Sequence, residues 1–220
     1  MITCIIPSRI DSSRFFKKAL EKINGKELIL HVCEIAKKSK MIDKIFVASE
    51  DEEILELVQK HGFDTIKTDS YLSCTHKISE VSKKLNSQYI INLQGDEPCI
   101  DPKWIDDLIE FSIRNDHKFV QVCYEVDQKD LLDEDCVKCL VNNDNIIFLS
   151  RKIDTPNLLG VCGLYFYKKE IIDEYTSYDL SLVKHYKGLD TFGFIGKVPV
   201  IPFIISQRPH AVDRQEDIEI

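Results

Sequence analysis

The stretch Ile90-Ile91-Asn92-Leu93-Gln94-Gly95-Asp96-Glu97-Pro98 decides the fold of this 220-residue chain. It begins as a buried strand, and Gly95 then allows the chain to turn sharply. The turn presents Gln94, Asp96 and Glu97 at the carboxyl end of a strand, where open α/β sheets bind ligands. A carboxylate there is well placed to hold a divalent metal against a phosphate. The alternative is an ordinary strand-to-helix turn in which Asp96 caps a backbone amide.

Strands and helices alternate on both sides of this stretch in the first half of the chain. The apolar spacing predicts strands over residues 2–6, 44–48, 64–67 and 89–93, and helices over residues 26–38, 52–61, 76–85 and 102–113. Gly62 fits the C-cap of the second helix, and Pro102 fits the first position of the fourth. This alternation predicts an α/β fold with a mostly parallel sheet and helices on both faces.

The pattern changes in the second half. Strands are predicted over residues 118–126, 137–142, 145–149, 161–167 and 198–205, with shorter helices over residues 169–175 and 179–185. Asn142-Asn143-Asp144-Asn145 is a strong hairpin turn between two of these strands. We therefore expect a mixed, partly antiparallel second half. Because the chain shows no repeat, low-complexity tract or linker, residues 1–220 are predicted to form one domain.

Composition narrows the class of protein. The net charge of −8 provides no basic field for a nucleic acid or an anionic membrane. A substrate that carries phosphate would therefore need locally gathered Lys and Arg, or a metal. No apolar run is long enough for a transmembrane helix. The amino-terminal residues read as a first strand rather than a signal peptide, so we expect a cytoplasmic protein.

The eight cysteines are expected to be free thiols in a reduced compartment. Most lie in apolar runs, namely Cys4, Cys33, Cys99, Cys123 and Cys162. Cys136 and Cys139 form the one close pair, but no second such pair or pair of histidines accompanies them to complete a zinc site. Structural cysteines are the favoured interpretation.

The loop after the first strand gathers phosphate-binding side chains. Residues 7–18 contain two arginines, two lysines and three serines: Arg9, Arg14, Lys17, Lys18, Ser8, Ser12 and Ser13. Arginine grips phosphate oxygens with two parallel bonds, while lysine supplies a point charge and hydroxyls fill the remaining positions. The chain has neither of the standard glycine-rich phosphate motifs. The loop is a candidate polyphosphate cradle, and a solvated basic loop is the alternative.

A second acidic candidate lies near the end of the chain, at Asp213. Taken alone, Asp213 is better explained as the N-cap of a final helix, with Glu216 completing a capping box. A residue at a helix start can also ligate a metal through its side chain, so both interpretations stay open.

Three groups of motifs, in order and over nearly the whole chain, resemble the 3-deoxy-manno-octulosonate (Kdo) cytidylyltransferases. The opening segments are Ile6-Pro7-Ser8-Arg9, Ser13-Arg14, Lys18-Ala19-Leu20 and Asn24-Gly25-Lys26. Ile91-Asn92-Leu93-Gln94-Gly95-Asp96-Glu97-Pro98 is similar to the most distinctive motif of that family. The closing segment is Val212-Asp213 followed by Glu216-Asp217-Ile218-Glu219. The resemblance implies a nucleotide-diphospho-sugar transferase-like α/β fold and a homodimer paired through the mixed second half.

The resemblance also implies an activity. A hydroxyl of a sugar acid would attack the α-phosphorus of CTP and release pyrophosphate, with Mg²⁺ neutralising the phosphates. By motif, Asp96 and Asp213 would ligate Mg²⁺, while Arg9, Arg14 and Lys18 would hold the triphosphate. Further implied contacts to the nucleotide or the sugar acid come from Ser8, Ser12, Ser73, Thr75, Gln94, Arg151 and Tyr165. Arg151 alone would otherwise be taken for a surface arginine.

The chain departs from the family pattern at a few positions on the nucleotide side, which is largely kept, and more extensively on the sugar side, which is not. Phe16-Lys17 replaces a Pro-Gly pair, Cys74 replaces a glycine, and Val161-Cys162 stands where a histidine is expected. Residues 181–190 replace a glutamate-rich helix. His185 and His210, in regions that the family uses for the acceptor, are candidate replacement contacts.

Three hypotheses follow. The leading one is a Mg²⁺-dependent cytidylyltransferase that acts on a Kdo-like acid. The second keeps CTP but uses another acceptor, either a different keto-sugar acid or a phosphonate. The third is a nucleotide-binding subunit without turnover.

Overall fold

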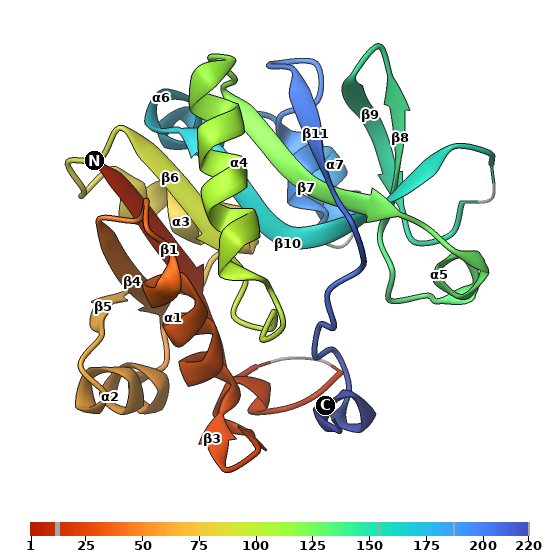
Figure 1. Ribbon diagram of the computed structural model, residues 1–220. Coiled ribbons are helices and arrows are strands. Elements are labelled where there is room, and N and C mark those ends of the chain that lie inside the picture. Colours follow the sequence, from red (N-terminus) through yellow and green to blue (C-terminus); the bar gives the residue numbers. More distant parts are fainter. Residues whose placement is uncertain (12–13, 154, 187, 220) are drawn as a thin grey trace.

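The computed structural model describes residues 1–11, 14–153, 155–186 and 188–219 (Figure 1). The strands are β1 (Ile2–Pro7), β2 (Lys22–Ile23), β3 (Lys26–Glu27), β4 (Lys44–Ser49), β5 (Asp64–Lys67), β6 (Tyr89–Leu93), β7 (Phe119–Glu125), β8 (Lys138–Asn142), β9 (Asn145–Ser150), β10 (Leu158–Lys168) and β11 (Val200–Ile205). The α-helices are α1 (Leu28–Lys38), α2 (Glu52–Lys60), α3 (Cys74–Ser82), α4 (Pro102–Arg114), α5 (Gln128–Leu132), α6 (Lys169–Glu174) and α7 (Ser181–His185). Short 3₁₀ helices include η1 (Lys18–Leu20), η3 (Asp190–Gly193) and η4 (Gln215–Ile218).

The central sheet has the strand order β11-β7-β10-β6-β1-β4-β5, and the β8–β9 hairpin is attached to β10. The pairs β1–β4, β1–β6 and β4–β5 are parallel, whereas β10 is antiparallel to both β6 and β7. The predicted change from a parallel first half to a mixed second half is therefore confirmed. Because the chain leaves β1 toward β4 on one side and returns to β6 on the other, the carboxyl end of β1 is a topological switch point.

Helices cover both faces of this sheet. In Figure 1, α1 and α4 lie in front of it and α3 lies behind. Cys4 and Ile6 of β1 face the core cluster shared with α1, α2 and α4, while Ile5 faces the cluster shared with α3, α6 and α7. Alternate side chains of a strand point to opposite faces, so a strand buried on both sides is apolar throughout. Each such side chain contributes about 1.5–3 kcal/mol to folding.

Several predicted element bounds are wrong, for local reasons. Helix α3 begins at Cys74 rather than at residue 76, because the Ser73 hydroxyl accepts the His76 N–H at 3.3 Å and caps the helix two residues earlier. The first two residues of the predicted helix 26–38 instead form β3 and pair with β2. Helix α5 was not predicted at all, although Asp127 opens it with a capping box.

The turn residues behave partly as expected. Asn143 and Asp144 both have positive φ angles, as a tight two-residue hairpin requires, and Gly62 ends α2 with φ of 80°. The reason given for Gly95 is wrong, because its φ is not in the left-handed region. A Cβ there would lie 3.1 Å from the Pro7 carbonyl oxygen and 3.2 Å from Ile29 Cδ1. Gly95 is needed for this close approach to β1 and α1.

All eight cysteines are free thiols. Cys4, Cys33, Cys123 and Cys162 are buried as expected, whereas Cys99 is only half-buried. Cys136 and Cys139 are also buried, and Cys136 Sγ lies 3.1 Å from the Tyr124 hydroxyl. These two cysteines therefore pack against β7 and have a structural role, as expected.

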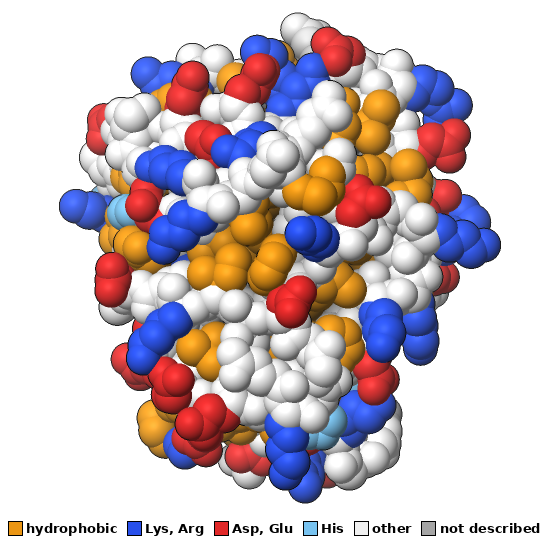
Figure 2. Space-filling model, turned by 90° about the vertical axis from the view of Figure 1, so that its left-hand side faces the viewer, with side chains coloured by type: hydrophobic (Ala, Val, Ile, Leu, Met, Phe, Trp, Pro, Cys, Tyr) orange, Lys and Arg blue, Asp and Glu red, His pale blue; other side chains and the backbone are white. Residues whose placement is uncertain are grey.

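Charged side chains of both signs are interspersed over the face of the molecule shown in Figure 2, with hydrophobic side chains visible between them near its centre. Among the described residues, no helix is both long enough and apolar enough to cross a membrane.

Close packing between β7 and β10 gives a test of this fold. A Cβ at Gly160 would lie 2.2 Å from Tyr124 Cζ, so Gly160→Ala should destabilise the protein by about 1–3 kcal/mol through overpacking. Urea unfolding would measure the loss. In a Tyr124→Leu background the same substitution should cost much less, and an equal cost in both backgrounds would contradict this register.

Candidate active site

Two adjoining cavities lie beyond the carboxyl ends of β1, β4 and β6. The larger, of about 590 Å³, is lined by residues that follow these strands, including Ser8, Glu50 and Gln94. The smaller, of about 160 Å³, extends over β7, β9 and β10. Gln94, Asp96 and Arg151 line both. We call them the first-strand cavity and the β10 cavity.

Lys18 joins three distant parts of the chain where the two cavities meet. Its ammonium group, largely buried, donates to Asp96 Oδ2 at 2.7 Å and to the Val212 carbonyl at 2.8 Å, and it lies 3.9 Å from Asp213 Oδ1. Burial, followed by the negative charge of Asp96, raises the pKa of Asp213. The two predicted metal ligands therefore converge on one cation.

The interpretation of Asp213 as a helix cap is wrong. The 3₁₀ helix η4 begins after Arg214, and Asp217 Oδ2 accepts the N–H groups of both Asp213 and Arg214 at 2.9 and 2.7 Å. The Asp213 carboxylate is thus left to face the cavity. The capping alternative for Asp96 also fails, since its carboxylate binds Lys18.

Arg14 lines both cavities. Its guanidinium binds Asp135 at 2.6 Å and Asp213 at 2.5 Å, and these two carboxylates raise its pKa against the opposing effect of burial. Asp135 also binds Arg214 Nε at 2.6 Å. The guanidinium must exchange these acidic partners before it can bind a phosphate.

The rest of the cradle follows β1. Arg9 is exposed and lines the first-strand cavity. Ser8 is buried, its N–H donates to the Ala48 carbonyl, and its own carbonyl accepts Lys77 Nζ at 3.0 Å. Lys77 also binds Glu50. Ser12 and Ser13 lie outside the described residues.

Lys17 stands where the resemblance led us to expect the glycine of a Pro-Gly pair. Its φ is 57°, in the left-handed region that glycine adopts at little cost, and its N–H donates to the Ile10 carbonyl at 3.0 Å. The loop therefore keeps a glycine-type turn with a lysine in it, at a cost of about 1 kcal/mol.

Helix α3 begins beside the first-strand cavity. Ser73 and Cys74 line it, but Thr75 is 1% exposed and its N–H donates to Asp190 Oδ2 at 2.7 Å. Asp190, from η3, lines both cavities. Of these predicted contacts, Ser73 is placed at the surface of the cavity and Thr75 behind it.

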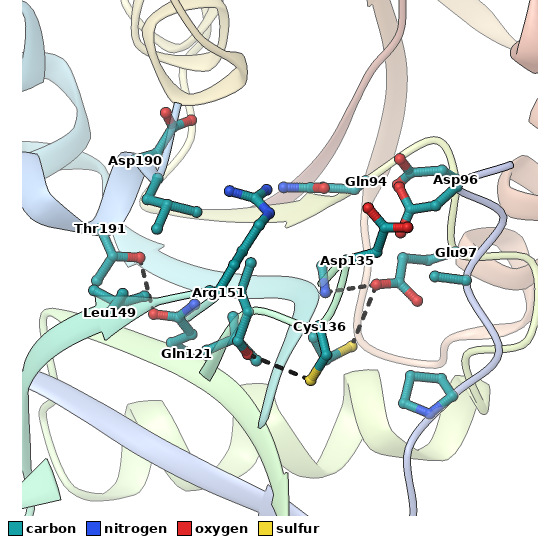
Figure 3. A pocket seen from close by; sticks show the side chains of 18 of the residues that line it. Gln94, Asp96, Glu97, Gln121, Asp135, Cys136, Leu149, Arg151, Asp190 and Thr191 are labelled. Carbon is teal, nitrogen blue, oxygen red and sulfur yellow. Dashed lines mark hydrogen bonds between the residues drawn. The ribbon is translucent and has the colours of Figure 1, made fainter. Parts of the chain in front are cut away.

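The β10 cavity holds the predicted sugar-side residues (Figure 3). Gln94 Nε2 lies 3.4 Å from the Tyr165 hydroxyl, and Arg151 lies between Gln94 and Gln121. Arg151 is half-buried, and burial, together with the positive charge of Arg14, lowers its pKa. Its guanidinium suits an anionic ligand. His210 instead donates from Nε2 to the Asp217 carbonyl oxygen at 2.9 Å, and His185 packs against Tyr186.

Glu97 lines the β10 cavity and binds the backbone of β10. Its Oε1 accepts the Gly163 N–H at 2.7 Å, and burial raises its pKa to about 8, with a further contribution from Asp96. Gly163 is needed there, because a Cβ would lie 2.7 Å from Glu97 Oε1.

Asp135, Lys77 and Gln121 were not singled out as site residues from the sequence. Asp135 follows a strand only after an intervening helix that was not predicted. Gln121 did carry a signal, since it is the one amide within the apolar run Phe119-Val120-Gln121-Val122-Cys123.

Comparison with known proteins shows to which family this chain belongs. The sequence model of the cytidylyltransferase family matches residues 3–190. The chain belongs to this family. A 3-deoxy-manno-octulosonate cytidylyltransferase of Chlamydia pneumoniae is 31% identical to it, over 97% of this chain and 89% of the relative. An 8-amino-3,8-dideoxy-manno-octulosonate cytidylyltransferase of Shewanella pealeana is 32% identical, over 100% of this chain and 96% of the relative.

A solved structure agrees with the assignment. The CMP:2-keto-3-deoxy-manno-octonic acid synthetase in complex with CTP superposes on this cytidylyltransferase with a TM-score of 0.90 and 26% identity, over 99% of this chain and 95% of that one. The predicted resemblance, the nucleotide-diphospho-sugar transferase-like fold and the nucleotidyltransferase class of enzyme are all confirmed.

Glu97 gives this cytidylyltransferase a pH-dependent stability. In the unfolded chain this carboxyl ionises near its ordinary value of 4.5, while in the folded protein it keeps its proton up to about pH 8. Its contribution is therefore present below pH 4.5 and is lost as the pH rises to about 8. Glu97→Gln keeps the acceptor for Gly163 and cannot ionise. Relative to wild type, its unfolding free energy should rise on the order of 5 kcal/mol across this window.

Urea unfolding of both proteins at several pH values would measure this difference. A constant difference between pH 4.5 and pH 8 would contradict the raised pKa of Glu97.

Proposed function

We propose that this cytidylyltransferase transfers CMP from CTP to a Kdo-like keto-sugar acid and releases pyrophosphate. The observation that carries the proposal is the convergence of Asp96 and Asp213 on the buried ammonium of Lys18, between a cavity rich in cations and a smaller cavity that contains Arg151. A sugar acid in the smaller cavity would meet a nucleotide triphosphate in the larger one at this point.

The residues of the chain supply positioning and charge. The hydroxyl of the acid attacks the α-phosphorus, a new P–O bond forms, and the bond to the β-phosphate oxygen breaks. Lys18, Arg9 and Arg14 would stabilise the charge that develops on the phosphate oxygens, with Ser8 and Ser12 adding contacts from the same loop. Ser73 would lie toward the nucleotide, while Thr75, behind the cavity surface, would hold Asp190 in place. Gln94, Tyr165 and Arg151 would orient the acid, with Arg151 on its carboxylate.

The residues present fit a Mg²⁺ ion. Asp96 and Asp213 already face one cation in this structure, and Mg²⁺ is commonly held by one or two carboxylates together with substrate phosphates. When bound, Mg²⁺ would neutralise the phosphates and polarise the phosphorus. Lys18 would then be free of Asp96 and could bind the leaving pyrophosphate.

Other predictions from the sequence stay proposals. They are a single domain over residues 1–220, a homodimer paired through the mixed second half, and a cytoplasmic location without nucleic acid or membrane partners.

The function is tested by incubating the protein with CTP, Mg²⁺ and a panel of acids while pyrophosphate is measured. The panel contains Kdo, its 8-amino-8-deoxy analogue, other keto-sugar acids and a phosphonate. Release with Kdo supports the proposal, and release only with another acid names a different acceptor. Thermal stabilisation by CTP without release for any acid would indicate a nucleotide-binding subunit.

Asp96→Asn and Asp213→Asn should each lower kcat by about 100-fold or more, because each removes a charge from the metal site. Asp101→Asn is the matched control, since Asp101 caps α4 away from both cavities and asparagine also caps well. Chelation of Mg²⁺ with EDTA should abolish turnover by wild type. If either site variant kept wild-type turnover, the metal assignment would be wrong.

Arg151→Met should raise the KM for the acid at least tenfold and leave the KM for CTP nearly unchanged, because the guanidinium would bind only the acid. Arg114→Met, on the exposed face of α4, serves as the control. An equal rise in both KM values would place Arg151 on the nucleotide instead.

A further inference from the structure

Gln121 is a buried polar residue on the central strand β7. It is 0% exposed, and within β7 its neighbours Val120 and Val122 are apolar and equally buried. It lines the β10 cavity together with Arg151 and Thr191, as Figure 3 shows. An amide at the centre of an apolar strand costs free energy unless its polar atoms are hydrogen-bonded.

Only one end of this amide is satisfied. The Thr191 hydroxyl donates to Gln121 Oε1 at 2.9 Å, and Thr191 is itself 3% exposed. Gln121 Nε2 is also buried, yet none of the described residues accepts its hydrogen bonds. A buried donor without a partner is rare in folded proteins and usually has a functional or strain-related cause.

Packing alone does not account for this residue. Methionine has nearly the same length and would fill the space without a polar group to bury. Gln121 instead lines a cavity that also contains Arg151 and Tyr165, and its N–H₂ group is buried there without a partner. The arrangement is that of a preformed binding group whose partner arrives with the ligand.

We propose that Gln121, oriented by Thr191, donates a hydrogen bond to an oxygen atom of the acceptor acid and so selects the acid at that position. This inference rests on the proposed function. Gln121 is the binding residue and Thr191 is a positioning residue, because the threonine hydroxyl fixes which end of the amide faces the cavity.

The chemistry of the unpartnered Nε2 end of the Gln121 amide sets the preference. Because Oε1 is occupied by Thr191, the amide offers only N–H groups to the ligand. A hydroxyl, carbonyl or carboxylate oxygen can accept such a bond, whereas an ammonium group cannot. At this position the cavity therefore selects an oxygen substituent over an ammonium substituent, and it should reject an analogue that lacks the oxygen.

The test uses Gln121→Met and Thr191→Val in the pyrophosphate assay. Gln121→Met should raise the KM for the acid about tenfold, with the KM for CTP unchanged, and it should also leave the melting temperature equal to or above that of wild type. A purely structural glutamine would give the opposite result, a lower melting temperature and no selective change in KM. Thr191→Val should raise the KM for the acid several-fold through loss of orientation.

Ser112→Ala is the matched control. Ser112 is also 0% exposed and hydrogen-bonded, through its hydroxyl to the Leu108 carbonyl at 2.7 Å, but it lies on α4 away from the cavity. It should lower stability without a change in either KM.

Deoxy analogues of the acid, each lacking one hydroxyl, sharpen the test. Wild type should discriminate against one of them, and Gln121→Met should lose that discrimination. Unchanged KM values and discrimination in Gln121→Met and Thr191→Val, with an active wild type, would overturn this inference alone. A wild type that releases pyrophosphate with no acid would overturn the proposed function and this inference with it.

Discussion

The buried ammonium of Lys18 is the contact on which the rest of the site depends. It comes from the loop after β1 and binds the carboxylate of Asp96 beyond β6 and the carbonyl of Val212 near the carboxyl-terminal end. The Val212 N–H in turn donates to the Asp96 carbonyl at 2.9 Å. A buried charge is costly unless it is paired and fully hydrogen-bonded, and here both carboxylates and the carbonyl surround it. Loss of this group would leave two acidic groups facing each other.

Helix α3 provides a second connection, between the two cavities. Lys77 near its first turn holds the carbonyl of Ser8, and the N–H of Thr75 is held by Asp190 from η3. The loop after β1 and the 3₁₀ helix η3 are therefore both attached to α3.

The residues that depart from the family pattern have different structural roles. Lys17 has a backbone conformation that suits glycine, so the turn expected for a Pro-Gly pair forms here with a lysine in it. Val161-Cys162 stands where the resemblance led us to expect a histidine, and Cys162 Sγ lies 3.8 Å from Oε1 of the buried Glu97. Gln121 and Thr191 provide polar groups to the β10 cavity from β7 and η3. The polar groups of the β10 cavity thus come from β7, β10 and η3 and from the ends of β6 and β9 together.

The sequence by itself determined the strand–helix alternation, the hairpin at Asn143 and Asp144, and the motifs around Asp96, because apolar periodicity and turn chemistry are local properties. It could not determine helix bounds that a single capping residue sets, as Ser73 does for α3. It also could not determine the role of Asp213, because the expected capping hydrogen bond is made by the Asp217 carboxylate instead. Only the tertiary structure decided that Asp135 holds Arg14 and that Gln121 meets Thr191. These contacts join residues far apart in the chain, and their partners depend on which strands the sheet places side by side.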